Sequence, residues 1–200
     1  MPRVTRTAGL LLTGGASARL GTPKAELRRD GERLADRNAT LLAEVCTVTL
    51  EVGPGYSTLP AVREDPPGSG PLAALVAGAA ALPPRAAALP VLVLGVDLPF
   101  VDAALLTWLA ARPGVGTVVP RVAGSPQPLC ARYGVADLAV AAQLRADGAA
   151  SMRALLDVAA VTYLDEADWG DVTDASRFGD VDTPDAAARA GLEGPPAPLR

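Results

Sequence analysis

The chain has 200 residues, 50% of them hydrophobic and 20% charged, which is the size and composition of one folded domain and excludes a disordered chain. Its net charge of −4 argues against a general nucleic-acid binder, because such proteins normally carry a basic surplus. It contains no histidine, which excludes an imidazole base and a histidine-ligated metal; any metal would be bound through oxygen, which favours Mg²⁺ or Mn²⁺.

Strands and helices are predicted to alternate along the chain. Short apolar or β-branched runs predict the strands Gly9–Thr13, Cys46–Val52, Pro60–Arg63, Pro90–Val96, Val115–Pro120, Leu129–Tyr133 and Ala159–Leu164. Helical spacing and caps predict the helices Arg33–Glu44, Ala103–Ala111 (capped by Asp102), Val135–Arg145, Ser151–Val158 (capped by Ser151) and Pro184–Ala190, and an alanine-rich helix that begins at Gly70-Pro71 and is ended by Pro83. This order predicts a three-layer α/β/α sandwich with a mostly parallel, Rossmann-like sheet. Ligands bind at the carboxyl ends of such strands, so we expect the loops after Thr13, Val52, Arg63 and Val96 to converge.

Residues 1–192 are predicted to form a single domain and residues 193–200, EGPPAPLR, a flexible tail. The apolar run Ala8–Leu12 is shorter than the core of a signal peptide, and the longest uncharged run is interrupted by prolines, so we expect a cytoplasmic protein without membrane contact. Cys46 and Cys130 lie in apolar surroundings, and we expect two buried free thiols rather than a disulfide.

The segment from Leu10 to Leu27, LLLTGGASARLGTPKAEL, has the composition of a phosphate-binding loop. Its glycines allow backbone N–H groups to approach oxyanions, Ser17 can donate a hydrogen bond, and Arg19 and Lys24 bring positive charge. Lys24 is the one lysine of the chain, beside 17 arginines. The spacing fits neither the Rossmann fingerprint nor the Walker A loop. An ordinary strand-to-helix connection is the weaker interpretation.

Acidic residues near two strand ends are candidates for a metal site. Asp97 directly follows the most apolar strand and could hold Mg²⁺, while Asp102 suits the capping of the next helix. Asp180 and Asp182 in FGDVDTP lie on the same side of an extended segment, and one of them could complete the site. The alternative is that Asp182 or Thr183 caps the following helix.

A third acidic position precedes a turn rich in proline and glycine. Asp65 could accept hydrogen bonds from a ribose or a base edge, although a surface turn is the simpler interpretation.

In this order, the motifs LLLTGG-x-S-x-R-x-G-x-P-K-A, Asp65…GPLAAL, VLVLGVDLPF and FGDVDTPDA resemble the nucleotidyltransferases of glycosyltransferase-A type. Within these, the chain is most similar to the molybdenum cofactor guanylyltransferases of the MobA family, over about residues 8–190. The resemblance implies a Mg²⁺-dependent enzyme that transfers GMP from GTP to the phosphate of molybdopterin and releases pyrophosphate. Such transfers depend on positioning and charge neutralisation, so a chain without histidine is compatible with them.

The resemblance also implies roles for individual residues. Arg19, Lys24 and Asp97 are the expected catalytic residues, because the cations neutralise the triphosphate and Asp97 binds the metal. Asp182 lies where the family often has an asparagine near the metal and is the second expected ligand. The expected nucleotide-binding residues are Leu12, Thr13, Gly14, Gly15, Ser17, Lys24, Asp65, Gly70 and Asp97. GTP and molybdopterin are the expected substrates, and molybdoenzymes or other proteins of cofactor biosynthesis are the expected partners.

Several positions depart from the family's pattern. Thr13 stands where the family often has alanine, and Glu51-Val52-Gly53 occupies the region where guanylyltransferases often place an asparagine. Ala74 replaces a glycine, and Asp180 and Asp182 replace asparagines. These changes spare the phosphate and metal positions and bear on guanine recognition. The alternatives are therefore a molybdopterin cytidylyltransferase, a nucleotidyltransferase of another small phosphorylated acceptor and, from another class, a non-catalytic nucleotide-binding module.

Overall fold

The computed structural model describes residues 6–15 and 20–194. Its strands are β1 (Ala8–Leu12), β2 (Arg28–Arg29), β3 (Glu32–Arg33), β4 (Val48–Val52), β5 (Ala61–Val62), β6 (Val91–Gly95), β7 (Thr117–Val122), β8 (Ser125–Pro126), β9 (Cys130–Tyr133) and β10 (Val161–Leu164). Its helices are α1 (Leu34–Val45), α2 (Pro71–Ala80), α3 (Ala103–Ala110), α4 (Val135–Ala146), α5 (Met152–Leu156), α6 (Glu166–Trp169) and α7 (Pro184–Arg189), with the 3-10 helices η1 (Lys24–Glu26) and η2 (Ala175–Phe178).

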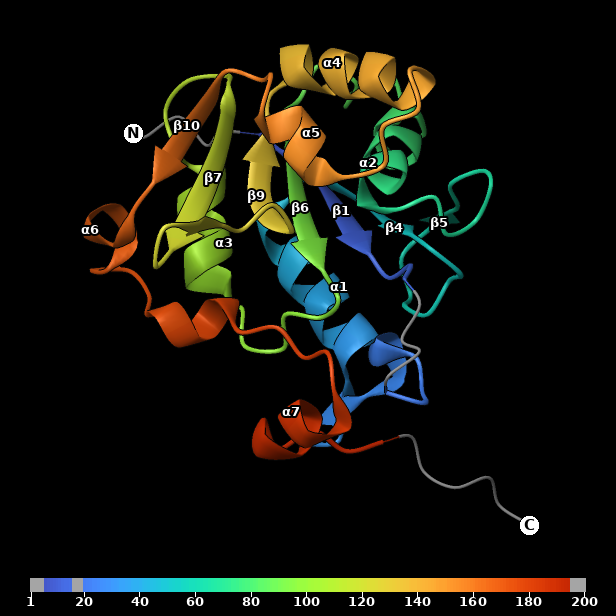
Figure 1. Ribbon diagram of the computed structural model, residues 1–200, viewed down its shortest axis with the longest axis vertical. Helices are drawn as coiled ribbons and strands as arrows, with labels where there is room; N and C mark the ends of the chain where they lie inside the picture. The colour runs from blue at the N-terminus through green and yellow to red at the C-terminus, as the bar shows by residue number, and fades with distance from the viewer. Residues whose placement is uncertain (1–5, 16–19, 195–200) are drawn as a thin grey trace.

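A central sheet lies between two layers of helices (Figure 1). Its strands follow the order β10-β7-β9-β6-β1-β4-β5, with β8 paired to β7 outside this path. Helices α1 and α3 pack together on one face, and α2, α4 and α5 cover the other. The three-layer α/β/α architecture predicted from the sequence is confirmed.

Strand β1 lies at the centre because all five of its residues, AGLLL, are buried between the two helical layers. It pairs in parallel with β4 on one side and β6 on the other. The register sets Leu12 beside both Val52 and Gly95, so the three strands end at the same level. The predicted convergence of the loops at these strand ends is therefore confirmed.

Strands β8 and β9 depart from the parallel pattern, and β8 runs antiparallel to β7. β9 runs antiparallel to both of its neighbours, β6 and β7. The chain returns from β7 through β8 and a short loop, and an antiparallel strand needs only such a short connection, whereas a parallel one needs a crossover. The sheet is consequently mixed. Its strands β5, β4, β1 and β6, where the sequence motifs lie, pair in parallel, as do β7 and β10 at the other edge.

A glycine sets how closely α2 approaches the sheet. A Cβ atom on Gly78 would lie 2.6 Å from Cδ1 of Leu10 and 2.7 Å from Cγ2 of Val52. Any larger residue would therefore push the helix away from β1 and β4. This close packing brings the start of α2, at Gly70 and Pro71, to the carboxyl edge of the sheet.

Three helix caps follow the sequence-based expectations. The side chain of Asp102 accepts a hydrogen bond from the Leu105 amide at 3.0 Å, and Ser151 does the same from Ala154 at 3.3 Å. In the FGDVDTP segment the cap of α7 is Thr183, which accepts from the Ala186 amide at 3.1 Å. Asp182 is therefore not needed for capping.

Arg132 is fully buried and holds two segments together. Its guanidinium donates hydrogen bonds to the carbonyl oxygens of Ala110 and Arg112, at the end of α3, and of Gly114 and Gly116, before β7. Hydrogen bonds to these four carbonyls replace part of the hydration that the buried cation has lost, whereas its Nε atom is buried without a hydrogen-bond partner.

Glu193, the first residue of the predicted tail, is attached to the fold. Leu192 is buried, and Glu193 forms a β-bridge with Arg28 through two backbone hydrogen bonds of 2.8 and 2.9 Å. Glu193 is thus fixed to the β2–β3 hairpin and is not part of a frayed end. The remainder of the predicted tail, from residue 195 on, lies outside the described residues.

Both cysteines are free thiols, as predicted, but only Cys130 is fully buried, whereas Cys46 is half-buried.

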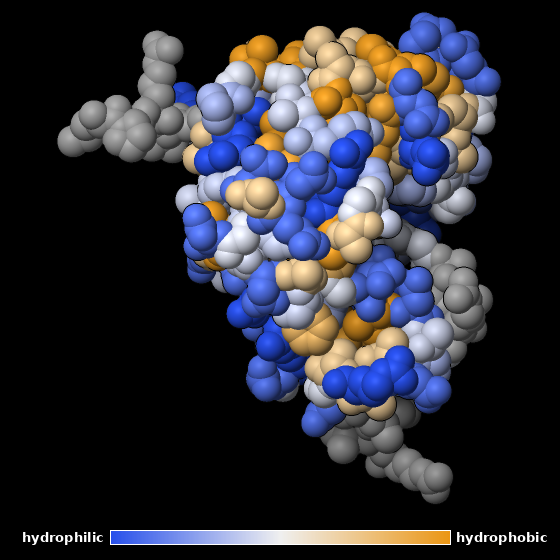
Figure 2. All heavy atoms as spheres, turned by 60° about the vertical axis from the view of Figure 1, so that its left-hand side comes forward, coloured by the Kyte–Doolittle hydropathy of each residue, from blue (hydrophilic) through white to orange (hydrophobic). Residues whose placement is uncertain are grey.

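Three large hydrophobic side chains are exposed in the described part of the chain: Val115, Val135 and Val158. They adjoin the start of β7, the end of β9 and the start of β10, at the edge of the sheet opposite to the carboxyl end of β1. Figure 2 shows one face of the molecule, where hydrophobic residues are most frequent at the upper end and are interspersed with hydrophilic ones below it. Across the described residues, none of the helices has both the length and the apolarity needed to cross a membrane.

Candidate active site

Two adjoining cavities lie at the carboxyl ends of β1, β4, β5 and β6. The larger measures about 590 Å³ and the smaller about 370 Å³, which is the range of small-molecule sites. The residues that line both are Thr13, Gly14, Gly15, Lys24, Glu64 and Gly68. The loop after β1 therefore forms a wall common to both cavities.

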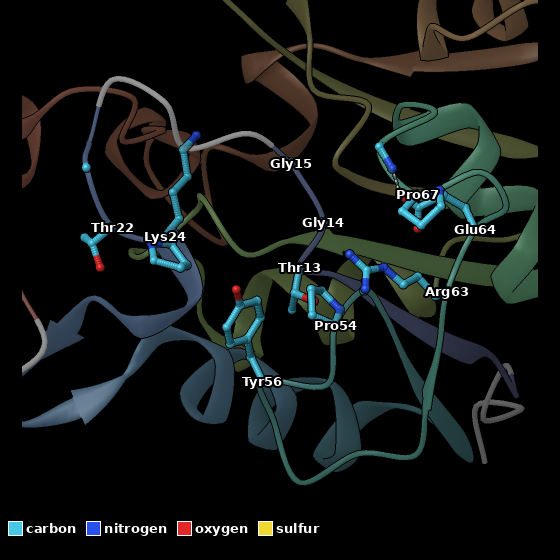
Figure 3. A pocket seen from close by; sticks show the side chains of 14 residues that line it. Thr13, Gly14, Gly15, Thr22, Lys24, Pro54, Tyr56, Arg63, Glu64 and Pro67 are labelled. Atoms are coloured by element: carbon cyan, nitrogen blue, oxygen red, sulfur yellow. Dashed lines mark hydrogen bonds between the residues drawn. The ribbon is translucent and has the colours of Figure 1, made fainter.

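The larger cavity has a cation on each of two sides (Figure 3). Lys24 and Thr22 lie on one side and Arg63 and Glu64 on the other, with Thr13, Pro54 and Tyr56 between them. The guanidinium of Arg63 points towards Thr13 and Pro54 and makes no ion pair with any described residue. Together with the half-buried ring of Tyr56, it offers planar surfaces on which a nucleobase can stack.

The smaller cavity is more apolar. Its further walls come from the ends of β1 and β6, the start of α2 and the residue before β9, namely Leu12, Gly70, Pro71, Ala74, Gly95, Val96, Asp97 and Leu129. Asp97 is the acidic group that this cavity adds, and Lys24 is common to both cavities. The polar groups are thus concentrated where the two cavities meet.

Lys24 brings together the two acidic residues that the sequence analysis assigns to a metal site. Its Nζ atom donates a hydrogen bond to Oδ1 of Asp182 and lies 3.5 Å from Oδ2 of Asp97. The segment with Asp182 is attached to the end of β6 by a hydrogen bond of 3.1 Å from the Val181 amide to the Asp97 carbonyl. Residues 24, 97 and 182, far apart in the sequence, therefore form one charged cluster.

The pKa of the Asp97 carboxyl is raised above its usual value. Burial is the main cause, and the negative charges of Asp180 and Asp182 act in the same direction, whereas the nearby Lys24 ammonium opposes them. A carboxylate in such surroundings is stabilised by an added cation. The side chains of Lys24 and Asp97 are 18% and 21% exposed and that of Asp182 is 50% exposed, so the cluster is accessible to a ligand.

The donor atoms of this cluster fit Mg²⁺ or Mn²⁺, because both ions prefer carboxylate oxygens. Within residues 6–15 and 20–194 no group of three or more acidic or cysteine side chains is close enough to bind a metal by itself. A metal bound between Asp97 and Asp182 would therefore complete its coordination with phosphate oxygens and water, as Mg²⁺ does in nucleotide enzymes.

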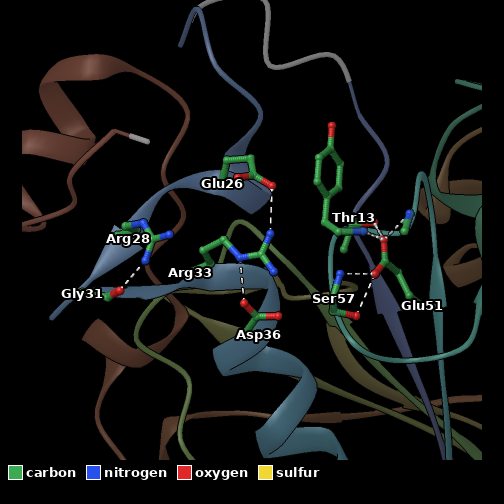
Figure 4. A network of polar contacts seen from close by, with 10 residues as sticks. Thr13, Glu26, Arg28, Gly31, Arg33, Asp36, Glu51 and Ser57 are labelled. Carbon is green, nitrogen blue, oxygen red and sulfur yellow. Dashed lines mark hydrogen bonds and ion pairs between the residues drawn. The ribbon is translucent and has the colours of Figure 1, made fainter. Parts of the chain in front are cut away.

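A buried carboxylate that was not among the predicted site residues holds the loop after β4 (Figure 4). Glu51 accepts hydrogen bonds from the Thr13 hydroxyl at 2.6 Å, from the amides of Gly55 and Tyr56 at 2.8 Å each, and from the amide and hydroxyl of Ser57 at 2.7 Å each. Burial alone would raise its pKa, but these hydrogen bonds outweigh burial and the pKa is lowered. A charged residue inside the apolar strand VTLEV is the sequence signal that could have identified it.

Seven of the residues predicted to bind the nucleotide line the cavities: Leu12, Thr13, Gly14, Gly15, Lys24, Gly70 and Asp97. Asp65 does not: it is exposed, and its neighbour Glu64 lines both cavities instead. Asp182 does not line either cavity, but it contacts Lys24, which lines both. Ser17 and Arg19 lie outside the described residues.

The fold and its charged cluster are those of a nucleotidyltransferase: a glycine-rich loop and a lysine lie beside two carboxylates at the carboxyl edge of the sheet. The chain belongs to the family of MobA-like NTP transferase domains, whose family model matches residues 9–165.

Individual relatives agree with this assignment. The chain is 37% identical, over 154 residues, to a probable molybdenum cofactor guanylyltransferase of Opitutus terrae, covering 73% of this chain and 75% of that protein. Its fold is similar to that of molybdopterin-guanine dinucleotide biosynthesis protein A from Archaeoglobus fulgidus, with a TM-score of 0.76, 20% identity and 92% and 96% of the two chains covered. It is also similar to Rv0371C of Mycobacterium tuberculosis in complex with manganese, with a TM-score of 0.61, 16% identity and 92% and 97% covered.

Proposed function

We propose that the protein transfers GMP from GTP to the phosphate of molybdopterin, in a Mg²⁺-dependent reaction that releases pyrophosphate. The observation that carries this proposal is the position of Lys24, which touches Asp97 and Asp182 and lines both adjoining cavities. One cavity can hold the nucleotide and the other the acceptor, with the reacting phosphates at their junction. The names of the curated relatives support GTP and molybdopterin as the two substrates.

In this mechanism the residues of the chain position charge. The amides of Gly14 and Gly15 and the ammonium of Lys24 bind the oxygens of the triphosphate and neutralise the departing pyrophosphate. Arg19, predicted from the sequence, adds a second cation. Asp97 and Asp182 would hold the Mg²⁺, which supplies further charge stabilisation to the phosphates. The attacking phosphate is already ionised, so no protein base is needed.

The direct test is to incubate the protein with molybdopterin, Mg²⁺ and GTP, CTP or ATP, and to detect the dinucleotide by mass spectrometry together with released pyrophosphate. We expect product with GTP. Product with CTP in preference to GTP would assign the protein as a cytidylyltransferase. Nucleotide binding without pyrophosphate release in the presence of molybdopterin would favour a non-catalytic module.

A further inference from the structure

A buried glutamate faces the site and is only partly hydrogen-bonded. Glu64 follows β5 directly, is 6% exposed and lines both cavities. Its Oε1 accepts a hydrogen bond of 2.9 Å from the Gly68 amide, whereas its Oε2 is buried and has no hydrogen-bond partner. Among the described residues that line the two cavities, Glu64 is the one that carries such an atom.

The carboxylate of Glu64 lies against the glycine-rich loop. A Cβ atom on Gly14 would be 3.5 Å from Oε1 and 4.0 Å from Oε2, so the absence of a side chain at Gly14 leaves the carboxylate facing the loop backbone. Glu64 forms no ion pair with any described lysine or arginine. A buried carboxylate oxygen without a donor is unfavourable, and a ligand that brings N–H groups would relieve this cost.

We propose that Glu64 recognises the guanine base of the nucleotide by accepting hydrogen bonds from its N1–H and its 2-amino group. Guanine presents these two donors side by side, and a carboxylate is an acceptor with two oxygens at a matching spacing. Adenine and cytosine present a single amino group beside an acceptor nitrogen, whose lone pair would face the carboxylate. Glu64 would therefore select guanine against both. This inference rests on the proposed function, since it assigns the base to the nucleotide of that reaction.

The neighbours of Glu64 are consistent with a base at this place. Arg63 directly precedes it and projects into the larger cavity, which Tyr56 also lines (Figure 3). A planar base that donates to Glu64 can stack on either group. Glu64 would then distinguish the base by its hydrogen-bonding edge, whereas stacking on Arg63 or Tyr56 would stabilise any base.

Calorimetric titration with GTP and with inosine triphosphate, which lacks the 2-amino group, tests this inference. The titrations use the full chain with Mg²⁺, as wild type and as Glu64→Gln. The exposed Glu44→Gln on α1 is the matched control. We expect the wild type to bind GTP at least about tenfold more tightly than inosine triphosphate, which is the loss of one charged hydrogen bond. Glu64→Gln should weaken GTP about 10- to 100-fold and bring the ratio of the two affinities close to one. Glu44→Gln should change neither value.

Two results would overturn the inference about Glu64 while leaving the proposed function in place. One is a wild type that binds GTP but does not discriminate against inosine triphosphate, a result that does not depend on whether the variant folds. The other is a folded Glu64→Gln protein that loses affinity equally for both nucleotides, which would make Glu64 a structural residue. A wild type that binds CTP in preference to GTP would overturn the proposed guanylyl transfer as well.

Discussion

The hydroxyl of Thr13 donates a hydrogen bond of 2.6 Å to Glu51, and it occupies the place that a side chain at residue 53 would need. A Cβ atom on Gly53 would lie 2.0 Å from the Thr13 Oγ1 atom. The first loop and the loop after β4 are therefore coupled in this chain. Glu51 fixes both of them, because it accepts hydrogen bonds from Thr13 and from the amides of Gly55, Tyr56 and Ser57.

We predict that Gly53→Ala destabilises the protein by about 1–3 kcal/mol, because the added methyl group overlaps Thr13. The double variant Thr13→Ala, Gly53→Ala should recover part of this loss, since the nearest atom is removed, although the Gly14 amide at 3.0 Å remains close. Urea unfolding of the two single variants and the double variant measures the coupling. Strictly additive effects would mean that the two positions are independent.

Replacing Glu51 by glutamine should lower the free energy of unfolding at neutral pH by about 2–3 kcal/mol, because an amide cannot accept all five hydrogen bonds and its NH₂ group faces other donors. The pKa of Glu51 is lowered in the folded state, so the stabilisation by its charge is fully present above its ordinary value of 4.5 and is lost as the pH falls through the lowered value. The stability difference between the two proteins should therefore shrink below pH 4.5.

Urea unfolding at a series of pH values tests this expectation, with Glu44→Gln as a control for the loss of one surface carboxylate. A difference that stays constant into acid would show that the ionised form of Glu51 is not the stabilising one.

Lys24→Met removes the cation at the junction of the two cavities while keeping a side chain of similar length. We expect kcat/KM for GTP to fall about 100- to 1000-fold, because the triphosphate and the departing pyrophosphate lose a direct counter-charge. Release of pyrophosphate measures the rate, and Arg85→Met, at an exposed cation away from the cavities, is the matched control. If Lys24→Met retained the GTP affinity of the wild type, the assigned phosphate contact would be wrong.

Asp97→Asn should abolish most of the pyrophosphate release and raise the Mg²⁺ concentration needed for half-maximal rate, since a neutral amide binds a divalent cation more weakly than a carboxylate. Its unfolding free energy should change far less than its rate. Titrating Mg²⁺ and Mn²⁺ into wild type and variant separates metal binding from folding. Near-normal turnover in Asp97→Asn would contradict the metal role.

The thiols should react slowly in the folded protein. Burial raises the pKa of Cys46 to about 11, although the Thr7 hydroxyl opposes this, and burial raises the pKa of Cys130 to about 12. The thiolate is the reactive form, so at neutral pH a thiol reagent should label neither group quickly, and the rate should rise with pH up to these values. In denaturant the reagent should label both thiols rapidly, giving two labelled groups per chain. A count below two would reveal a disulfide.

The sequence was sufficient to predict those strands and helices in which local preference and burial favour the same structure. The strands β1 and β6 are apolar throughout, and Asp102, Ser151 and Thr183 have the side chains that cap helices, so local preference and burial point to the same structure. The hairpin of β2 and β3 was missed because its strands are charged and only two residues long. Its signal was the pair Asp30-Gly31, both with positive φ, as a tight hairpin turn requires.

For the candidate site, the charged loop and the aspartate after the most apolar strand could be predicted because each belongs to a recognisable motif. The choice between Glu64 and Asp65 could not. Successive residues of an extended segment face opposite sides, so a shift of one residue exchanges the inward and outward carboxylate. Only the end of β5 and the hydrogen bond from the Gly68 amide decide that Glu64 turns inward.

The contacts of Arg132 require an arginine at this position and could not be made by a lysine. Two separate nitrogen atoms of Arg132 reach the four carbonyl oxygens around it, and each nitrogen donates to two of them. A lysine has a single nitrogen atom, so some of these buried carbonyl oxygens would have no hydrogen-bond donor. At this position the preference for arginine over lysine follows from where the chain's own backbone places these carbonyl oxygens.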